Sequence, residues 1–310
     1  MASRHHDSAQ SAPLREGVAL GVGATCIWGM FPLVFKTVSH IPALEVLAHR
    51  STWSLVFVTI LMAVMGRRDE LFARAFYEPR TLRIMAGSGL AIAVNWGIFV
   101  WAVANDMVLQ SSLGYYISPL VSVALGVVVL RERLGALAWT AVGFATAGVL
   151  VLVIALGLVP WVSLGLAVSW AIYGYIRKTA PLGSLPGLFM ETLLLLPLAL
   201  AYIGWLAANG EAVFATSLDD SALLVGTGLV TVLPLLLFAR ATRILRLSTI
   251  GLLMYIVPTC QFALAVFVFE EPFTRTHLAA FVLIWTGLVI YSVSSARARV
   301  RDRVTVRPGS

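Results

Sequence analysis

The stretch Tyr116-Ile117-Ser118-Pro119 returns later in the chain as Tyr255-Ile256-Val257-Pro258. The difference in residue number between the two stretches is the same as that between Glu132 and Glu271 and between Gly148 and Gly287. A fainter echo, at a slightly larger difference, relates Trp28, Lys36 and Thr37 to Trp170, Lys178 and Thr179. Similarity at a nearly fixed separation is typical of an internal repeat. The sequence therefore predicts two related halves, which we place at residues 15–157 and 158–297.

The composition around these stretches is that of a membrane protein. Of the 310 residues, 59% are hydrophobic and only 12% are charged, with a mean hydropathy of +0.91. A soluble domain carries about 25% charged residues, and so few polar residues could not cover a globule of this size. With 25 Gly, 13 Pro and two Cys, the chain also fits no disordered, collagen-like or disulfide-rich class.

The apolar residues fall into continuous runs that predict helices. A hydrocarbon core about 30 Å thick needs about 20 helical residues, and a helix leaves no backbone group unpaired in lipid. Runs such as Leu193-Leu194-Leu195-Leu196 lack the alternation of a membrane β-barrel. We therefore expect an all-α polytopic membrane protein with ten transmembrane helices, at residues 17–36, 43–65, 82–104, 108–130, 136–156, 160–178, 185–206, 220–240, 247–269 and 276–296.

The basic residues predict the orientation of these helices. Of the 22 Lys and Arg residues, 19 fall in one set of alternate loops and tails and two in the other, and Arg50 lies within a span. Cytoplasmic loops carry the excess of Lys and Arg, so both termini are expected in the cytoplasm. The net charge of +7 is thus explained by topology rather than by nucleic acid. The tails, residues 1–14 and 298–310, are expected to be disordered, and the basic C-terminal one to lie near anionic lipid heads.

An odd number of spans in each half carries a mechanistic consequence. With five spans per half, the two halves must enter the membrane from opposite sides. Inverted repeats give two equivalent gates around a site at the midplane, which is the architecture of alternating access. The sequence therefore favours a transporter.

Several motifs give the chain a family resemblance that extends from about residue 15 to residue 295. It resembles the RarD-type subfamily of bacterial EamA proteins, within the drug/metabolite transporter superfamily. The resemblance rests on Ile27-Trp28-Gly29-Met30-Phe31-Pro32, Pro42-Ala43-Leu44-Glu45 with His49-Arg50, Asn95-Trp96, Ser112-Leu113-Gly114-Tyr115-Tyr116-Ile117-Ser118-Pro119 and Tyr255-Ile256-Val257-Pro258. It implies ten helices in two inverted halves, a central cavity surrounded by helices 1, 3, 4, 6, 8 and 9, and a permease of the bacterial inner membrane. It does not fix a substrate.

Ionisable groups within spans are the first candidates for function, because each costs about 2.5–3.5 kcal/mol on insertion scales. Glu45 and His49 lie one helical turn apart and are expected to meet, whereas Arg50 lies on a different face of the helix. An acid beside an imidazole suits proton coupling, and a structural ion-pair cluster near the outer headgroups is the alternative. Glu191 in span 7 is the candidate counterpart of Glu45 in the second half.

Polar and aromatic side chains in other spans are candidates for substrate contact. Asn95 shares a stripe with Phe99, Ala102 and Asp106 and could bind a substrate or a neighbouring helix. Aromatic walls suit an amphipathic or cationic molecule, and interhelical packing or interfacial belts are the alternative. The residues of these walls are Tyr115, Tyr116, Trp28, Trp170, Tyr173 and Tyr255, with Gln261 beside them. Pro119 and Pro258 are candidates for paired hinges or for fixed kinks.

Other matched or buried residues are expected to be structural. Glu132 and Glu271 lie just before spans 5 and 10 and are expected to cap those helices. Lys36 and Lys178 are expected to snorkel from span ends, and Trp161 and Trp205 to lie in interfacial belts. Cys26 and Cys260 sit in apolar runs as small hydrophobes, so we predict no disulfide and no metal site.

The function that fits best is secondary active transport, with export of a small metabolite or drug-like molecule and proton coupling through Glu45, His49 and Glu191. A channel or a structural membrane partner is the main alternative. A membrane-embedded enzyme is disfavoured because no span pairs histidines with a carboxylate as metal ligands or holds a nucleophile with its base. No nucleotide-binding cassette, catalytic residue or cofactor is predicted, and the sequence carries no signal for an oligomeric state.

Overall fold

The computed structural model describes residues 3–66, 78–130, 135–157, 159–245 and 253–305, and within them the chain is almost entirely helical. The helices are α1 (Ser3–Gly29), α2 (Phe31–Thr37), α3 (Ala43–Val64), α5 (Pro79–Ala104), α6 (Val108–Leu130), α7 (Ala136–Leu156), α8 (Trp161–Thr179), α9 (Ser184–Ala208), α10 (Leu218–Ile244), α12 (Ile256–Phe267) and α13 (Arg275–Thr305). Five segments of the described residues are long and apolar enough to cross a membrane: Arg15–Thr37, Ala43–Val64, Pro79–Ala104, Leu185–Ala208 and Leu218–Phe238. The predicted all-α polytopic class is confirmed.

The helix bounds depart from the predicted runs at both ends of the chain. The first run is broken at Met30, because Pro32 stands in the first turn of α2, where it starts a new helix more readily than it continues an old one. Residues 3–14 belong to α1, and α13 extends to Thr305, so the two helices reach into both predicted tails. Once a helix is formed, each further residue adds a hydrogen bond at little cost.

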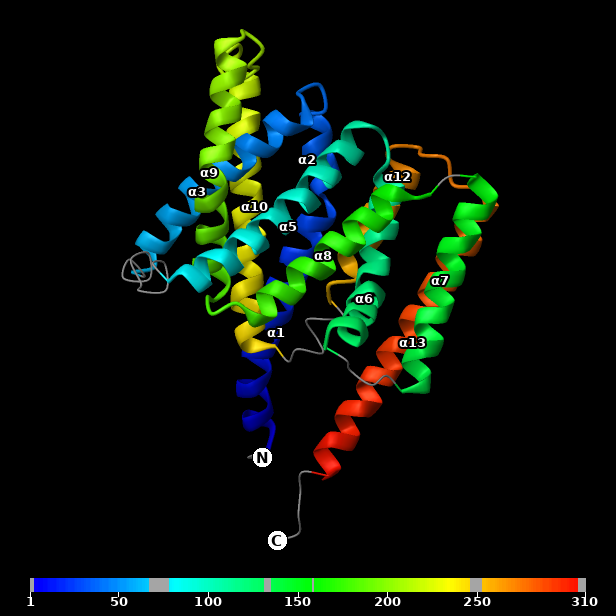
Figure 1. Cartoon of the computed structure of the whole chain (residues 1–310). Helices are drawn as coiled ribbons and strands as arrows, with labels where there is room; N and C mark the ends of the chain where they lie inside the picture. The colour runs from blue at the N-terminus through cyan, green and yellow to red at the C-terminus, as the bar shows by residue number, and fades with distance from the viewer. Residues whose placement is uncertain (1–2, 67–77, 131–134, 158, 246–252, 306–310) are drawn as a thin grey trace.

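Helices from both halves of the chain interleave in the bundle (Figure 1). Helix α7 packs along α13, α6 along α8, and α1 along α10, while α3 contacts both α9 and α10. The start of α1 and the end of α13 lie at the same end of the bundle. The most extensive packing is thus between halves rather than within them.

Two glycines set the contact between α7 and α13. A Cβ atom at Gly148 would lie 2.8 Å from the carbonyl oxygen of Ala280, and one at Gly287 would lie 2.7 Å from the carbonyl oxygen of Ala141. Small residues let two membrane helices approach to backbone contact. The repeat separation relates position 141 to position 280 and position 148 to position 287. The contact of Gly148 with Ala280 is therefore the counterpart of the contact of Gly287 with Ala141. The later position in α7 contacts the earlier position in α13, and the earlier position in α7 contacts the later one in α13, so the two helices are antiparallel.

A second pair of glycines repeats this relation elsewhere in the bundle. A Cβ atom at Gly89 in α5 would lie 3.3 Å from the carbonyl oxygen of Glu191 in α9. A Cβ atom at Gly228 in α10 would lie 2.5 Å from the Cβ atom of Trp53 in α3. Gly89 and Gly228 are related by the same offset as Gly148 and Gly287. The repeat seen in the sequence therefore marks helix contacts that occur twice.

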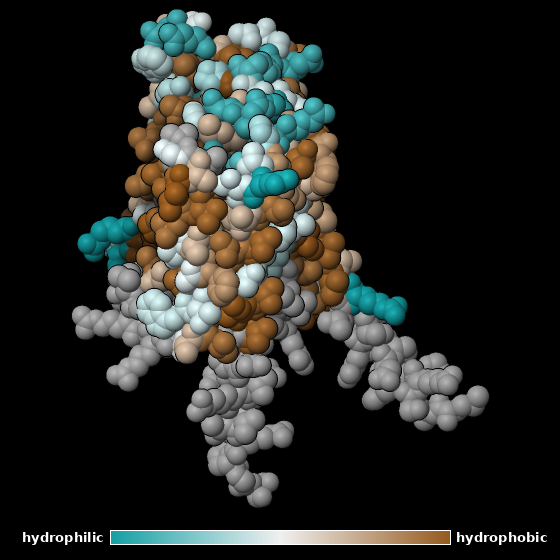
Figure 2. All heavy atoms as spheres, turned by 90° about the vertical axis from the view of Figure 1, so that its right-hand side faces the viewer, coloured by the Kyte–Doolittle hydropathy of each residue, from teal (hydrophilic) through white to brown (hydrophobic). Residues whose placement is uncertain are grey.

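The surface matches a protein that lies in lipid. Figure 2 shows hydrophobic side chains over the middle of one face and hydrophilic ones gathered toward one end. Large apolar side chains are exposed far beyond what water would favour, among them Val64 at 80%, Ile154 at 78% and Leu198 at 69%. The tryptophans expected in interfacial belts, Trp161 and Trp205, are half exposed.

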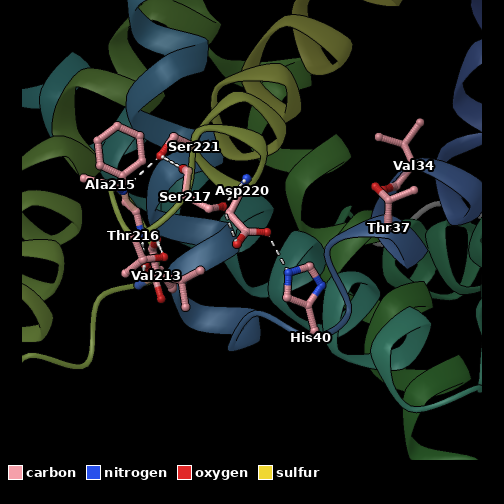
Figure 3. A network of polar contacts seen from close by, with 11 residues as sticks. Val34, Thr37, His40, Val213, Ala215, Thr216, Ser217, Asp220 and Ser221 are labelled. Atoms are coloured by element: carbon pink, nitrogen blue, oxygen red, sulfur yellow. Dashed lines mark hydrogen bonds and ion pairs between the residues drawn. The ribbon is translucent and has the colours of Figure 1, made fainter.

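Loops at the end remote from the termini tie the halves together (Figure 3). His40, after α2, lies 2.8 Å from the Asp220 carboxylate in the first turn of α10. Ser217 caps the same helix by accepting a hydrogen bond from the backbone N–H of Asp220 at 3.0 Å. Asx and hydroxyl side chains at this position satisfy the free N–H groups of a helix start. The loop after α2 is thus held to the start of α10.

Glu271 makes a stronger tie of the same kind. Its two carboxylate oxygens accept the backbone N–H groups of Val108 and Leu109, at 2.6 and 2.7 Å, at the start of α6. Burial raises the pKa of this carboxyl, and the two N–H groups oppose that shift. The expectation that Glu271 caps its own following helix is wrong, because the start of α6 offers it two free donors. Glu132 and the side chain of Lys178 lie outside the described residues, and Lys36 forms an ion pair with Asp106 at 2.5 Å.

The glycine contact between α7 and α13 can be tested by adding one methyl group. Gly148→Ala should lower the free energy of unfolding by about 1–3 kcal/mol, because the added carbon overlaps the α13 backbone. Gly143→Ala, on the same helix with open space around it, is the matched control and should gain roughly 0.5–1 kcal/mol from its helix propensity. Thermal unfolding of the purified variants measures the difference. Equal melting temperatures for the two variants would contradict the contact.

Candidate functional site

Glu45 and His49 do not meet as the sequence predicts. The Glu45 Oε1 atom accepts the backbone N–H groups of Val213 and Phe214, at 2.8 and 3.1 Å, in the loop before α10. The His49 ring stacks on Phe214 at 4.6 Å, and neither of its nitrogens has a hydrogen-bond partner. Hydrogen bonds from backbone N–H groups to an ionised carboxylate are charge-assisted and therefore strong. Glu45 therefore holds a loop of the second half against α3.

Arg50 lies in what we call the Arg50 cage. The guanidinium Nε donates to the Thr231 hydroxyl of α10 at 2.9 Å. Its carbon atom lies over three aromatic rings, at 4.2 Å from the centroid of Trp96, 4.8 Å from that of Phe35 and 5.5 Å from that of Phe31. Only 2% of the residue is exposed. Helices α2, α3, α5 and α10 thus enclose a cation near the join of the two halves.

Asn95 is the hub of a second group, the Asn95 cluster. Its side-chain amide donates to the carbonyl oxygen of Leu166 at 3.1 Å and to the Ser169 hydroxyl at 3.0 Å. The Tyr115 hydroxyl donates to its carbonyl oxygen at 3.4 Å. Helices α5 and α6 of the first half are thereby joined to α8 of the second. Asp106, expected on the Asn95 stripe, lies beyond the end of α5 and is exposed.

Glu191 is the hub of a third group, the Glu191 cluster, and only 1% of it is exposed. The Ser88 hydroxyl donates to Oε1 at 2.5 Å, and the Tyr173 hydroxyl donates to Oε2 at 3.5 Å. The Arg177 Nε lies 3.7 Å from Oε1. A buried carboxylate needs such partners to stay charged. Glu191 therefore faces protein in this bundle.

The packing gives Glu191 a different counterpart from the one expected. Glu191 lies against Gly89, and Trp53 lies against the matched Gly228. Glu191 therefore corresponds in place to Trp53, two turns further along α3 than Glu45. The glycine contacts thus relate Glu191 to Trp53, whereas the sequence analysis offered Glu45 as its counterpart.

The aromatic candidates divide between two places. Trp170 contacts Tyr115 edge to face at 6.2 Å between ring centroids and Tyr173 at 5.7 Å. These rings link the Asn95 cluster to the Glu191 cluster. Trp28 instead packs on Phe238 at 5.2 Å. The matched tryptophans Trp28 and Trp170 therefore do not share one wall, because each packs within its own helix pair.

Tyr116 joins α6 to α12 on the other side of the bundle. Its hydroxyl lies 2.8 Å from that of Thr259, and Ser112 donates to the carbonyl oxygen of Pro258 at 2.8 Å. Gln261 is buried in α12, and its carbonyl oxygen has no hydrogen-bond partner. Tyr255 precedes α12 and is half-buried. These contacts fix α12 against α6.

The two prolines stand in different helical settings. Pro119 lies inside α6, whereas Pro258 is the third residue of α12, just after a turn at Met254 and Tyr255. Proline fits the first turn of a helix without loss of a hydrogen bond. Pro258 therefore does not stand inside a helix as Pro119 does. The carbonyl of Pro258 is the one that Ser112 binds.

Metal and covalent chemistry have no visible site in the part of the chain that the structure describes. No group of three or more potential metal ligands occurs among those residues, and Cys26 and Cys260 are both free and half-buried. A shallow surface groove of about 250 Å³ is lined by Ala43, Leu44, Gly97, Ile98, Trp101 and Trp161. This groove contains none of the candidate residues.

Sequence reasoning missed the small polar partners of the candidates. Ser88, Ser169 and Thr231 each bind a candidate side chain. Arg177, which was not among the candidates, also reaches Glu191. The glycines Gly89 and Gly228, which stand at the repeat separation, could have indicated these helix contacts. Gly89 marks where α9 approaches α5, and Gly228 marks where α3 approaches α10. The hydroxyl groups themselves carry no comparable pattern.

Comparisons with known proteins show similarity to bacterial transporters. The family model described as "EamA-like transporter family" matches residues 15–154. An uncharacterized transporter of Pseudomonas aeruginosa is 42% identical over 93% of this chain and 97% of its own. The RarD protein of Streptomyces exfoliatus is 42% identical over 93% and 92%, and that of Escherichia coli is 38% identical over 89% and 94%.

The fold also has a match among solved structures. One crystal structure, titled only as that of a protein, aligns with a TM-score of 0.55 over 88% of this chain and 96% of its own, at 16% sequence identity. That likeness concerns the fold alone. The relatives bear the names of transporters rather than of enzymes. The chain therefore belongs to the EamA-like transporter family, as a RarD-type permease of the bacterial inner membrane.

Proposed function

We propose that the protein is a secondary active transporter that exports a small metabolite or drug-like molecule by alternating access. The observation that carries the proposal is the packing of α7 against α13, in which Gly148 and Gly287 occupy corresponding positions of the repeat and make equivalent contacts. Such a contact between antiparallel helices is expected of two halves related by a two-fold axis in the membrane plane. Inverted halves of this kind underlie alternating access.

The proposal assigns five spans to each half, residues 15–157 and 158–297, with both termini in the cytoplasm. The common end of α1 and α13 in Figure 1 is consistent with an even number of crossings. Rocking of one half against the other would open the site to each side in turn. The antiparallel contact of α7 with α13 is the proposed pivot, because each half contributes an equivalent helix to it.

The substrate site is proposed to lie where polar side chains of both halves converge. The Asn95 cluster joins α5 and α6 to α8, and the Arg50 cage joins α3 and α5 to α10. Interhelical hydrogen bonds in lipid hold helices together without water. A ligand that enters between the halves would replace some of these bonds, so its binding is coupled to helix position.

Proton coupling is proposed to act through the Glu191 cluster. The carboxylate is buried and faces Ser88 of α5 and Tyr173 and Arg177 of α8. Protonation would cancel the charge that Arg177 faces and weaken the link between α8 and α9. Glu45 and His49 are weaker candidates, because Glu45 is engaged by the loop before α10.

Counterflow in proteoliposomes tests the transporter proposal. Solutes that raise the melting temperature of the purified protein, from a panel of amino acids, amines and antibiotics, supply the substrates. A carrier should accumulate labelled solute against a preloaded unlabelled pool and should saturate. Non-saturable flux would instead indicate a channel, and absence of flux for every stabilising solute would indicate a structural membrane partner.

Glu191→Gln tests the proton-coupling proposal. The amide keeps a hydrogen-bonding side chain in place but cannot gain or lose a proton, so proton-driven transport should fall by about tenfold or more while counterflow persists. Glu211→Gln, in the exposed loop after α9, is the control and should leave both intact. Full transport with an unchanged pH profile in Glu191→Gln would remove this residue from the coupling mechanism.

A further inference from the structure

Arg50 is a buried cation without an anionic partner in the described part of the chain. It lies in α3, a segment long and apolar enough to cross a membrane, and is 2% exposed. None of the carboxylates in the described residues lies within 4 Å of its guanidinium. Charged groups in spans are normally paired with one another or mark the path of a ligand. Arg50 therefore calls for a partner that the described residues do not supply.

The contacts of the guanidinium leave one of its nitrogen atoms without a hydrogen-bond partner. Thr231 takes the Nε proton, whereas Nη1 is buried and has no hydrogen-bond partner. The rings of Trp96, Phe35 and Phe31 attract the cation through their faces but accept no conventional hydrogen bond from it. The rings thus keep the charge in place without neutralising it.

The acidic residue on the same helix is not free to fill this role. Glu45 is held through Oε1 by the N–H groups of Val213 and Phe214. Glu191 is engaged with Ser88, Tyr173 and Arg177. Both carboxylates therefore bind groups other than Arg50, although the Oε2 atom of Glu45 is itself buried without a hydrogen-bond partner, and the Arg50 cage remains a cationic site.

We propose that Arg50 binds the carboxylate of the transported solute, and that the solute is a small monocarboxylate with an apolar body. The planar guanidinium matches a carboxylate through two parallel hydrogen bonds. A single cation balances a single negative charge, and the surrounding aromatic rings suit an apolar body. A cationic ligand would not suit this cage, since the cation that Trp96, Phe35 and Phe31 hold belongs to the protein. This inference rests on the transporter proposal.

The location of the cage gives the bound anion a role in transport. Arg50 and Trp96 come from the first half, and Thr231 comes from the second. A carboxylate that binds the guanidinium at Nη1 would compete for the contact that now joins α3 to α10. Binding would therefore bias the position of one half relative to the other, as a transported substrate must.

Paired ligands test the proposal on the unmodified full-length protein. Phenylacetate and hexanoate, each compared with its neutral amide, are titrated into the protein in lipid nanodiscs, and melting temperature and calorimetric binding are recorded. The acids should bind at least about ten times more tightly than the amides, as expected for a charge-assisted pair. Equal responses to acids and amides, or no response to any acid, would overturn the proposal.

Variants locate the binding at the cage. Arg50→Gln should abolish the advantage of the acids, and Arg50→Lys, which keeps the charge but loses the planar fork, should weaken their binding by about tenfold. Arg240→Gln, at an exposed ion pair with Glu16, is the control and should bind the acids normally. If Arg50→Gln fails to fold, the Lys variant decides. Unchanged binding in it contradicts the assignment.

Counterflow separates this inference from the transporter proposal. Saturable exchange of neutral or cationic solutes that is indifferent to Arg50 would refute the carboxylate site and leave the transporter proposal standing. Binding of acids that depends on Arg50, without exchange of any solute, would refute transport and leave the site standing. Exchange of labelled phenylacetate that is lost in Arg50→Gln and reduced in Arg50→Lys is the result expected if both are correct.

Discussion

Backbone contact between α7 and α13 is the constraint from which the arrangement of the two halves follows. Gly148 and Gly287 each leave room for a carbonyl oxygen of the facing helix. In lipid, apolar side chains gain nothing by leaving one apolar surface for another, so close packing of small residues must hold helices together. The two contacts are equivalent in the repeat. They therefore favour one relative orientation of the halves, with α7 and α13 antiparallel.

The same lack of water explains where the polar side chains lie. A buried polar group in a span must find its partner in the protein. Asn95, Glu191 and Tyr116 do so across helix boundaries, and in each case they join helices that are distant in sequence. Loops at the end remote from the termini add Glu271 on the start of α6 and Glu45 on the loop before α10. Arg50 differs from these residues, because it is a buried cation and no carboxylate of the described residues lies within 4 Å of its guanidinium. That difference is why it is the strongest candidate for ligand contact.

Much of the helical layout could be predicted, because continuous apolar runs and the lipid thickness determine span positions closely. The predicted run 108–130 and the observed Val108–Leu130 coincide. The break at Met30 was missed, because a run of apolar residues hides the start of a new helix at Pro32. For the site, the sequence predicted candidate residues but not the contacts that those residues make. Helical spacing put Glu45 beside His49, but it cannot reveal that a loop in the other half of the chain supplies better donors. Likewise, the offset between the repeats marked Gly148 and Gly287, yet only packing showed that Glu191 corresponds to Trp53.

The most direct test of the central claim is the side of the membrane on which matching helix ends lie. Met65 follows the end of α3 and Asn209 follows the end of α9, and both are exposed. In a background with Cys26→Ser and Cys260→Ser, single Met65→Cys and Asn209→Cys variants are treated in whole cells with a membrane-impermeant maleimide. Halves of opposite orientation predict that Asn209→Cys is labelled from outside, and that Met65→Cys is labelled only after the membrane is opened. Labelling of both from the same face would contradict the account.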